Sequence, residues 1–283
     1  MPASGSCIFT DADAYQASLH DMLDLVVPEP GKFYARLTWV ELPILHLLRA
    51  REAAPRVAYV SLPAERVFVT FLTRQGSQLI CDGTELQFGD IMFHTPGERF
   101  HQRTTAATSW GSISLTPASL AAFGRTLSGR DPVLPPFGCI LRPSREDRGE
   151  LLRPHAQAGR IAETQLNHIA HSEVARALEQ DLVWALVNCL ASGEPRGVPT
   201  GRRRHAAIVA RFEASLTSAV DALSIPEICR MIGVPSAMLR ASCTQILGMG
   251  PARYLRLRRR HQAGPKRPRI KVSLKEPREG RER

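Results

Sequence analysis

Residues 224–258 read SIPEICRMIGVPSAMLRASCTQILGMGPARYLRLR, and this stretch decides the fold of the C-terminal part of the chain. Ser224 is followed three residues later by Glu227, which is the pattern of a capping box at the start of a helix. Pro226 falls in the first helical turn, where its missing N–H donor costs no hydrogen bond. The stretch therefore predicts a helix that begins at Ser224.

A tight turn and a second helix are expected next. Gly233 stands where the turn needs a permissive backbone, and Val234 is expected to pack beneath it. A second helix is then predicted over about residues 235–247, ending at Gly248. Two short helices joined by a glycine-containing turn are typical of a helix-turn-helix unit.

The charge of the chain is divided along its length. Residues 201–283 hold 19 Lys and Arg against 6 Asp and Glu, a balance of +13, whereas residues 1–200 hold 18 against 21, a balance of −3. All of the excess positive charge thus lies in the C-terminal third. This asymmetry is expected of a polyanion-binding module attached to a neutral domain.

The composition excludes several classes of protein. The 283 residues suffice for two domains, and 43% hydrophobic content is normal for a globular chain. No apolar run approaches the roughly 20 residues that a membrane-spanning helix needs. The N-terminus lacks a basic region followed by an apolar one, so no secretory signal is expected. We therefore expect a cytoplasmic protein with no membrane partner.

The cysteines predict neither disulfides nor a metal. All six are scattered, with no C-x-x-C pair and no His/Cys cluster at zinc spacing. They are expected to be reduced and small buried side chains, and no cofactor is predicted.

A β-rich region is expected over about residues 33–115. Short runs such as FYARLTWV, RVAYVSL and RVFVTFLT are rich in Val, Phe and Thr and are separated by turn residues. This spacing is typical of an antiparallel sandwich or barrel. Residues 1–30 are expected to add a short helix or an edge segment.

Residues 89–101, GDIMFHTPGERFH, resemble the second sequence motif of small cupin barrels. His94, Glu98 and His101 have side chains that can bind a metal, so a metal-dependent cupin enzyme is the alternative hypothesis. However, the paired H-x-H of catalytic cupins is missing from the preceding strands, where residues 68–82 contain no His. Turn and barrel-rim roles are favoured, with no catalytic or metal residue.

Helices are expected after a loop-like stretch at residues 119–144. Apolar residues recur at three- and four-residue intervals over residues 145–191. They pack either on the barrel or in a dimer interface, two compatible interpretations. The apolar residues concerned are Leu151, Leu152, Ile161, Leu166, Ile169, Ala170, Val174, Leu178, Leu182, Leu186 and Leu190.

A linker is predicted over residues 192–204, because this stretch is rich in Gly and Pro and lacks apolar periodicity. A helix follows it. Its apolar face is expected to contain Ile208, Phe212, Leu216 and Val220.

The helix-turn-helix segment resembles the first such unit of AraC/XylS-type transcriptional regulators, through S-I-P-E-I-C-R-M-I-G-V-P-S-A-M-L-R and L-G-M-G-P-A-R-Y-L-R-L-R-R. The resemblance implies a DNA-binding regulator that is not an enzyme, with partners in double-stranded promoter DNA, a small-molecule effector and a second copy of the chain. The expected fold class is α+β. Its parts are a cupin-like sensor and dimerisation domain at 1–191, the linker, a DNA-binding domain at 205–260 and a disordered basic tail at 261–283.

The resemblance also implies which side chains contact DNA. Ala237, Arg240 and Ala241 are expected at the base edges, and of these only Arg240 can bind guanine in bidentate fashion. The residues that it places for contacts with phosphates are Ser236, Thr244, Gln245 and Arg253.

The sequence departs from the family pattern after Arg258, where a second helix-turn-helix is expected. Residues 261–283 hold 8 Lys and Arg against 3 Glu, with no apolar periodicity. An early stop or an altered reading frame is favoured over a functional basic arm. Binding is expected to depend steeply on salt and to discriminate sequences poorly. A third hypothesis is a dimerising relic that does not read DNA.

Overall fold

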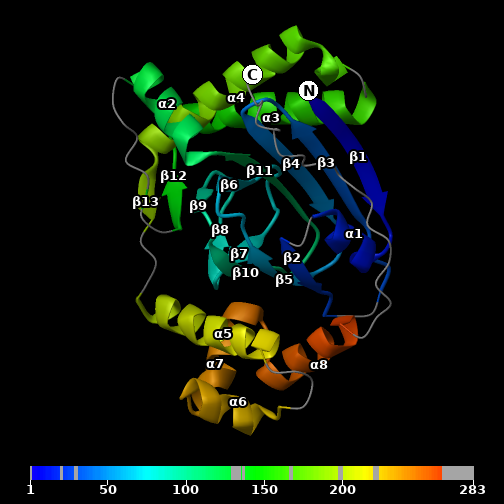
Figure 1. Cartoon of the computed structure of the whole chain (residues 1–283), viewed down its shortest axis with the longest axis vertical. Coiled ribbons are helices and arrows are strands. Elements are labelled where there is room, and N and C mark those ends of the chain that lie inside the picture. The colour runs from blue at the N-terminus through cyan, green and yellow to red at the C-terminus, as the bar shows by residue number, and fades with distance from the viewer. Residues whose placement is uncertain are drawn as a thin grey trace, which may run out of the picture.

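The structure is a computed structural model that describes residues 2–19, 22–28, 31–128, 135, 138–165, 168–196, 200–218 and 223–262. It contains two antiparallel sheets that face each other as a barrel (Figure 1). The larger sheet contains, in pairing order, β1 (Ala3–Phe9), β3 (Ala35–Glu41), β4 (Leu45–Glu52), β11 (Thr108–Leu115), β6 (Val67–Leu72), β9 (Ile91–His94), β12 (Cys139–Arg142) and β13 (Glu194–Arg196). The smaller sheet contains β2 (Leu23–Val26), β5 (Arg56–Ser61), β10 (Arg99–Thr104), β7 (Leu79–Cys81) and β8 (Thr84–Leu86).

The space between the two sheets forms one hydrophobic core. Leu37 and Trp110 from the larger sheet meet Ala58 and Phe100 from the smaller one, because alternate residues of each strand point inward. Helix α1 (Ala12–Ser18) adds Tyr15, which is fully buried in this core. The predicted barrel is therefore present.

Helices cover the outer face of the larger sheet (Figure 1). They are α2 (Pro117–Ser128), α3 (Arg145–Thr164), the 3-10 helix η1 (His168–Ala170) and α4 (Ser172–Ser192). The predicted apolar stripe, including Leu151, Leu178 and Leu182, is buried there against strand residues such as Val69 and Ile113. The stripe thus packs within the chain, and a homodimer stays a prediction.

Four helices form a separate cluster at the other end of the barrel, beside the smaller sheet (Figure 1). They are α5 (Thr200–Ser218), α6 (Ile225–Ile232), α7 (Ser236–Leu247) and α8 (Pro251–Gln262). Their hydrophobic core includes Phe212 and Leu239 and extends to Val26 and Val57 of the smaller sheet. The expected α+β class, a barrel with packed helices followed by an all-α part, is confirmed. Among the helices described, none has the length and apolar character needed to cross a membrane.

The expected extent of the barrel was too short. Strand β1 pairs along its whole length with β3, and β2 pairs with β5. The expected loop at residues 119–144 was also wrong, because most of α2 and all of β12 lie within it. Leu120 and Phe123 place α2 on the core, a short apolar pattern that the neighbouring Pro and Gly residues obscured.

The predicted linker at 192–204 is partly structured. Strand β13 lies inside it and pairs with β12 as the last strand of the sheet, where Pro195 needs no second partner. Helix α5 begins at Thr200, before the expected start at 205. Residues 197–199, the tail from 263 onward, Leu166 and Val220 lie outside the described residues, so the domain boundaries and the disordered tail stay predictions.

A buried histidine fixes α3 on the sheet. His155 is fully buried, and its Nε2 donates to the Leu48 carbonyl oxygen at 3.2 Å. Gly111 leaves room for the ring, since a Cβ there would lie 2.5 Å from His155 Cε1. Burial and then the positive charge of Arg49 lower the pKa of His155 to about 3. The folded protein therefore holds this imidazole neutral.

This histidine should make folding stability sensitive to acid. Its folded pKa lies below the unfolded value of 6.5, so the unfolded chain takes up a proton first, and the contribution present above pH 6.5 is lost as pH falls toward 3. When pH falls from 6.5 to 5, the free energy of unfolding of the wild type is expected to decrease by about 2 kcal/mol more than that of His155→Gln, a variant that keeps an N–H donor. Urea unfolding at both pH values measures this, with the exposed His168→Gln as the control. Equal losses in wild type and His155→Gln would contradict the assignment.

Candidate nucleic-acid interface

Helix α6 begins as the sequence predicts. The Ser224 backbone N–H donates to Glu227 Oε2 at 2.7 Å, and the Ser224 hydroxyl donates to the same oxygen at 2.6 Å. These hydrogen bonds, from the side chain and then the backbone of Ser224, lower the pKa of Glu227. Pro226 occupies the first turn. The capping box therefore fixes where the helix-turn-helix starts.

The turn depends on a glycine with left-handed backbone geometry. Gly233 has φ 66° and ψ 38°, a conformation that is strained for a residue with a Cβ. The Val234 N–H donates to the Cys229 carbonyl oxygen at 3.0 Å, which satisfies the end of α6. Gly248 ends α7 in the same way, with φ 72°. Both predicted ends are confirmed.

Helix α7 is held firmly against α5. Leu239, Cys243 and Ile246 are buried in the core of this helical cluster. His205 of α5 lies 2.8 Å from the Ser242 hydroxyl of α7, measured from Nδ1 to Oγ. One face of α7 is thus anchored, and the opposite face is left to solvent.

The exposed face of α7 carries most of the residues expected to contact DNA. It presents Ser236, Ala237, Arg240, Ala241 and Thr244, all of which are exposed. Their spacing places them on one side of a helix with about 3.6 residues per turn. Within the described part of the chain, the Arg240 side chain forms no hydrogen bond or ion pair, so its guanidinium is available to a partner.

Gln245 and Arg253, the other two expected contacts, lie beside the barrel. A Cβ added to Gly83, in the turn between β7 and β8, would lie 3.8 Å from Gln245 Cγ. Arg253 Nη2 donates to the Pro28 carbonyl oxygen at 3.2 Å. The structure therefore does not bring these two side chains into the exposed stripe of α7.

A buried polar network that the sequence did not predict joins the helical cluster to the barrel. Glu213 of α5 has no exposed surface. Its Oε2 accepts hydrogen bonds from His101 Nε2 of β10 at 3.3 Å and from the Tyr254 hydroxyl of α8 at 2.9 Å. Its Oε1 lies 2.7 Å from Arg258 Nη2, which also reaches Asp24 Oδ2 of β2 at 3.1 Å. This network ties two helices to two strands.

The network keeps Glu213 ionised. Burial alone raises the pKa of a carboxyl, but the hydrogen bond from His101 and the charge of Arg258 outweigh it, so the pKa of Glu213 is lowered. Burial and the nearby Glu213 raise the pKa of Tyr254, which stays protonated as a donor. One sequence signal was available: an acid beside Phe212 and Val209 on the apolar face of α5 needs a buried partner.

The three residues of the alternative metal hypothesis do not form one site. His94 Nδ1 lies 3.5 Å from Glu98 Oε1, and the His94 ring stacks on Phe100 inside the barrel. His101 follows Phe100 on the same strand and so points to the opposite face, where Glu213 binds it. No group of three metal-binding side chains is found among the residues that the structure describes.

The interior of the barrel contains its own ion pair. Arg56 Nε donates to Glu52 Oε2 at 2.9 Å, and Arg56 Nη2 donates to Gln102 Oε1 at 2.6 Å. Glu52 Oε1 also accepts from the Tyr15 hydroxyl at 2.7 Å and from Trp110 Nε1 at 3.0 Å. These side chains, rather than open space, occupy that part of the interior where an effector was expected.

Comparisons with known proteins find similarity in structure. No protein-family model and no curated sequence matches the chain. Its structure is similar to that of the AraC-like transcriptional activator CuxR, with 19% identity and a TM-score of 0.49 over 92% of this chain and 95% of that one. ToxT from Vibrio cholerae shares 13% identity, with a TM-score of 0.29 over 76% of this chain and 98% of that one. The cupin domain of Cnp3 from Schizosaccharomyces pombe shares 9% identity, with a TM-score of 0.25 over 34% of this chain and 71% of that one.

Proposed function

We propose that the chain is a DNA-binding transcriptional regulator of AraC type that acts on promoter DNA in the cytoplasm. The observation that carries the proposal is the exposed stripe on α7, in which the guanidinium of Arg240 has no partner among the residues that the structure describes. In helix-turn-helix proteins the second helix enters the major groove and contacts base edges through its N-terminal residues. No catalytic role is proposed for the barrel.

Each residue of the stripe has a distinct proposed role. Arg240 binds O6 and N7 of a guanine through its planar fork. Ala237 and Ala241 offer only apolar contact with a thymine methyl group. Ser236 and Thr244 donate to phosphates, which positions the helix without specifying sequence. Recognition by this helix therefore depends mainly on one base contact.

The contact between α7, α8 and the barrel supports a link between sensing and DNA binding. Gln245 and Arg253 gain freedom to contact phosphates when their contacts near Gly83 and Pro28 loosen. A small molecule that binds the barrel better in one arrangement shifts the population toward it. Homodimerisation is part of the proposal, because helix-turn-helix proteins commonly bind paired half-sites as dimers.

A fluorescence-anisotropy titration tests the DNA-binding function. The full chain is titrated into labelled duplexes that it has itself selected from a random library, and into a random duplex, at 50 and 200 mM salt. Binding with a steep loss of affinity at the higher salt is expected, because neutralising Z phosphates gives a slope near −0.9Z. Absence of binding at low salt, or binding that salt does not change, rejects the proposal.

The variant Arg240→Ala tests the mode of recognition. It is expected to cost about 1–3 kcal/mol on the selected duplex and much less on the random one, because a bidentate base contact is lost. The matched control is Arg153→Ala, which removes an exposed arginine from α3 and should change neither affinity. Equal losses of affinity on both duplexes would instead show that Arg240 contacts phosphate.

A further inference from the structure

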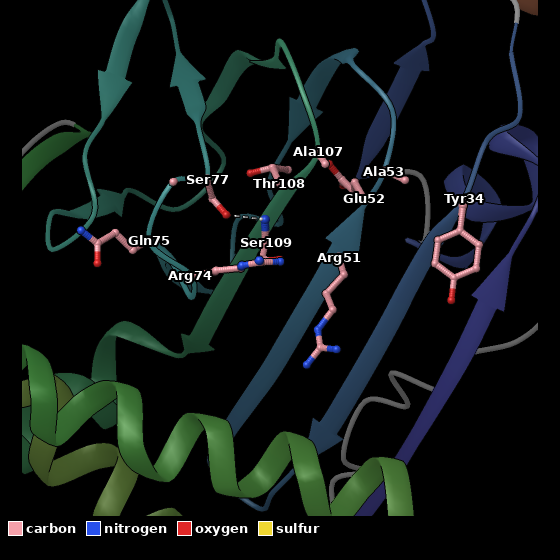
Figure 2. Close-up of a pocket in the computed structure, with 11 residues that line it drawn as sticks. Tyr34, Arg51, Glu52, Ala53, Arg74, Gln75, Ser77, Ala107, Thr108 and Ser109 are labelled. Atoms are coloured by element: carbon pink, nitrogen blue, oxygen red, sulfur yellow. Dashed lines mark hydrogen bonds between the residues drawn. The ribbon is translucent and has the colours of Figure 1, made fainter.

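A groove of about 460 Å³ lies on the barrel, apart from the stripe on α7 (Figure 2). Its walls come from the residue before β3, the end of β4, the turn after β6 and the start of β11. Its volume is within the usual range of about 300–1,000 Å³ for small-molecule sites. None of its lining residues belongs to α5, α6, α7 or α8.

Two arginines give the groove a positive charge. Arg51 and Arg74 are both exposed, and neither side chain forms a hydrogen bond or an ion pair with any residue in the described ranges. Arg51 lies on β4 and Arg74 in the turn after β6, and Figure 2 shows both among the residues that line the groove. Two guanidinium groups over one groove, both without a side-chain partner in the described part of the chain, can bind an anion.

The acidic groups near the groove do not cancel this charge. Glu52 lines the groove, but it is 3% exposed and its oxygens bind Arg56 inside the barrel. Glu163 lies 3.5 Å from Arg36, the residue paired in register with Arg51, and is engaged there.

Further positive charge crowds the same face of the sheet. Arg49 lies two residues from Arg51, on the same side of β4. Its Nε is buried and has no hydrogen-bond partner among the described residues. Burial and the charges of Arg51 and Arg160, opposed by Glu163, lower the pKa of Arg49. The arginines at this end of the sheet therefore carry more positive charge than the nearby carboxylates neutralise.

Neutral groups of the groove suit a ligand with both phosphate and ring parts. The Ser77 hydroxyl accepts from the Ser109 N–H at 3.0 Å, which leaves its own proton to donate. Tyr34 is 40% exposed and stands at the other end of the groove from Arg74 (Figure 2). An exposed aromatic face of this kind stacks on a planar ring.

We propose that this groove binds a phosphorylated small molecule of nucleotide size, with its phosphates on Arg51 and Arg74 and its ring beside Tyr34. The planar guanidinium of arginine forms two parallel hydrogen bonds with a phosphate, which the ammonium group of lysine, a point charge, does not. The meaning of this ligand as an effector rests on the proposed function, whereas its binding does not.

Isothermal titration calorimetry of the full chain with ADP, pyrophosphate and adenosine tests the site without DNA. ADP and pyrophosphate are expected to bind saturably at low salt, and adenosine at least about tenfold more weakly, because the phosphates carry the charge-assisted hydrogen bonds. Arg51→Ala and Arg74→Ala should each weaken ADP binding about ten- to hundredfold, and Arg51→Lys should weaken it less than Arg51→Ala. The control is Arg176→Ala, an exposed arginine on α4, which should bind as wild type does.

Several results would overturn the site. They are no saturable binding of either phosphorylated probe, equal binding of adenosine, and unchanged ADP affinity in both alanine variants. If those variants weaken the binding of duplex DNA as much as they weaken the binding of ADP, the groove belongs to the DNA-binding surface and the small-molecule site is rejected. The calorimetry is carried out without DNA, so its failure is distinguishable from failure of the proposed DNA-binding function. A DNA titration with and without ADP then tests whether ADP binding and DNA binding are coupled.

Discussion

Replacing Arg56 with methionine is expected to lower the free energy of unfolding by about 3–5 kcal/mol. Arg56 is 1% exposed and donates to both oxygens of Glu52, which is 3% exposed. Methionine fills much of the same space but leaves the Glu52 carboxylate buried without its guanidinium. The loss arises from this uncompensated charge rather than from lost packing.

A double variant separates these two causes. Glu52→Gln combined with Arg56→Met removes both charges and keeps an acceptor oxygen for Tyr15 and Trp110. The double variant should therefore lose much less free energy of unfolding than Arg56→Met alone. Urea unfolding followed by tryptophan fluorescence measures both. Arg176→Met, at an exposed position, is the control and should remain within about 0.5 kcal/mol of wild type. A double variant that is less stable than Arg56→Met would show that packing dominates.

Replacing Arg258 with methionine is expected to cost a similar amount, about 3–5 kcal/mol, at the junction between α8 and the barrel. Glu213 then keeps its hydrogen bonds from His101 and Tyr254 but loses the guanidinium 2.7 Å away. The double variant Glu213→Gln with Arg258→Met should lose less free energy of unfolding than the sum of the losses in the two single variants. Arg256→Met, on the exposed face of the same helix, is the control and should be nearly neutral.

The variants at the two ion pairs should differ in how they unfold. All three tryptophans, Trp39, Trp110 and Trp184, lie in the barrel and its covering helices. In Arg258→Met, loss of far-ultraviolet circular dichroism should begin at a lower urea concentration than the change in fluorescence, because the helical cluster is released first. In Arg56→Met the fluorescence transition itself should shift. Coincident transitions in Arg258→Met would show that the network does not hold the two parts together.

Acid should act on the same network. The pKa of Glu213 is lowered in the folded protein, so its contribution is present above the ordinary carboxyl value of 4.5 and is lost as pH falls below it. Without Arg258, the opposing effect of burial is offset less, and the pKa of Glu213 rises. The Arg258→Met variant should therefore begin to unfold at a higher pH than wild type.

The local features of the C-terminal part followed directly from the sequence. The capping box of Ser224 and Glu227, the left-handed Gly233 and the end of α7 at Gly248 involve residues within a few positions of one another. Neighbouring residues determine such features, because the hydrogen bonds that stabilise them are formed by the same short segment. The exposed stripe around Arg240 followed as well, since helical periodicity fixes which residues share a face.

Some features of the barrel could be predicted only in outline. Alternating Val, Phe and Thr indicated strands, but α2 and β13 lay hidden in stretches rich in Gly and Pro. Strand β13 exists because β12 offers it an edge, and Pro195 is tolerated only at that edge. Local propensity cannot reveal a strand whose stability depends on a partner about 55 residues away in the chain.

By itself, the sequence determined the two-part organisation, the helix-turn-helix and the division of charge, because composition and short-range periodicity encode them. The tertiary structure alone decided which polar groups meet. It placed His101 on Glu213 rather than with His94, brought Arg258 to the same carboxylate, and set Arg51 and Arg74 over one groove. These contacts join residues on separate strands and helices, and the pairing register and helix packing that create them arise only when the whole chain folds.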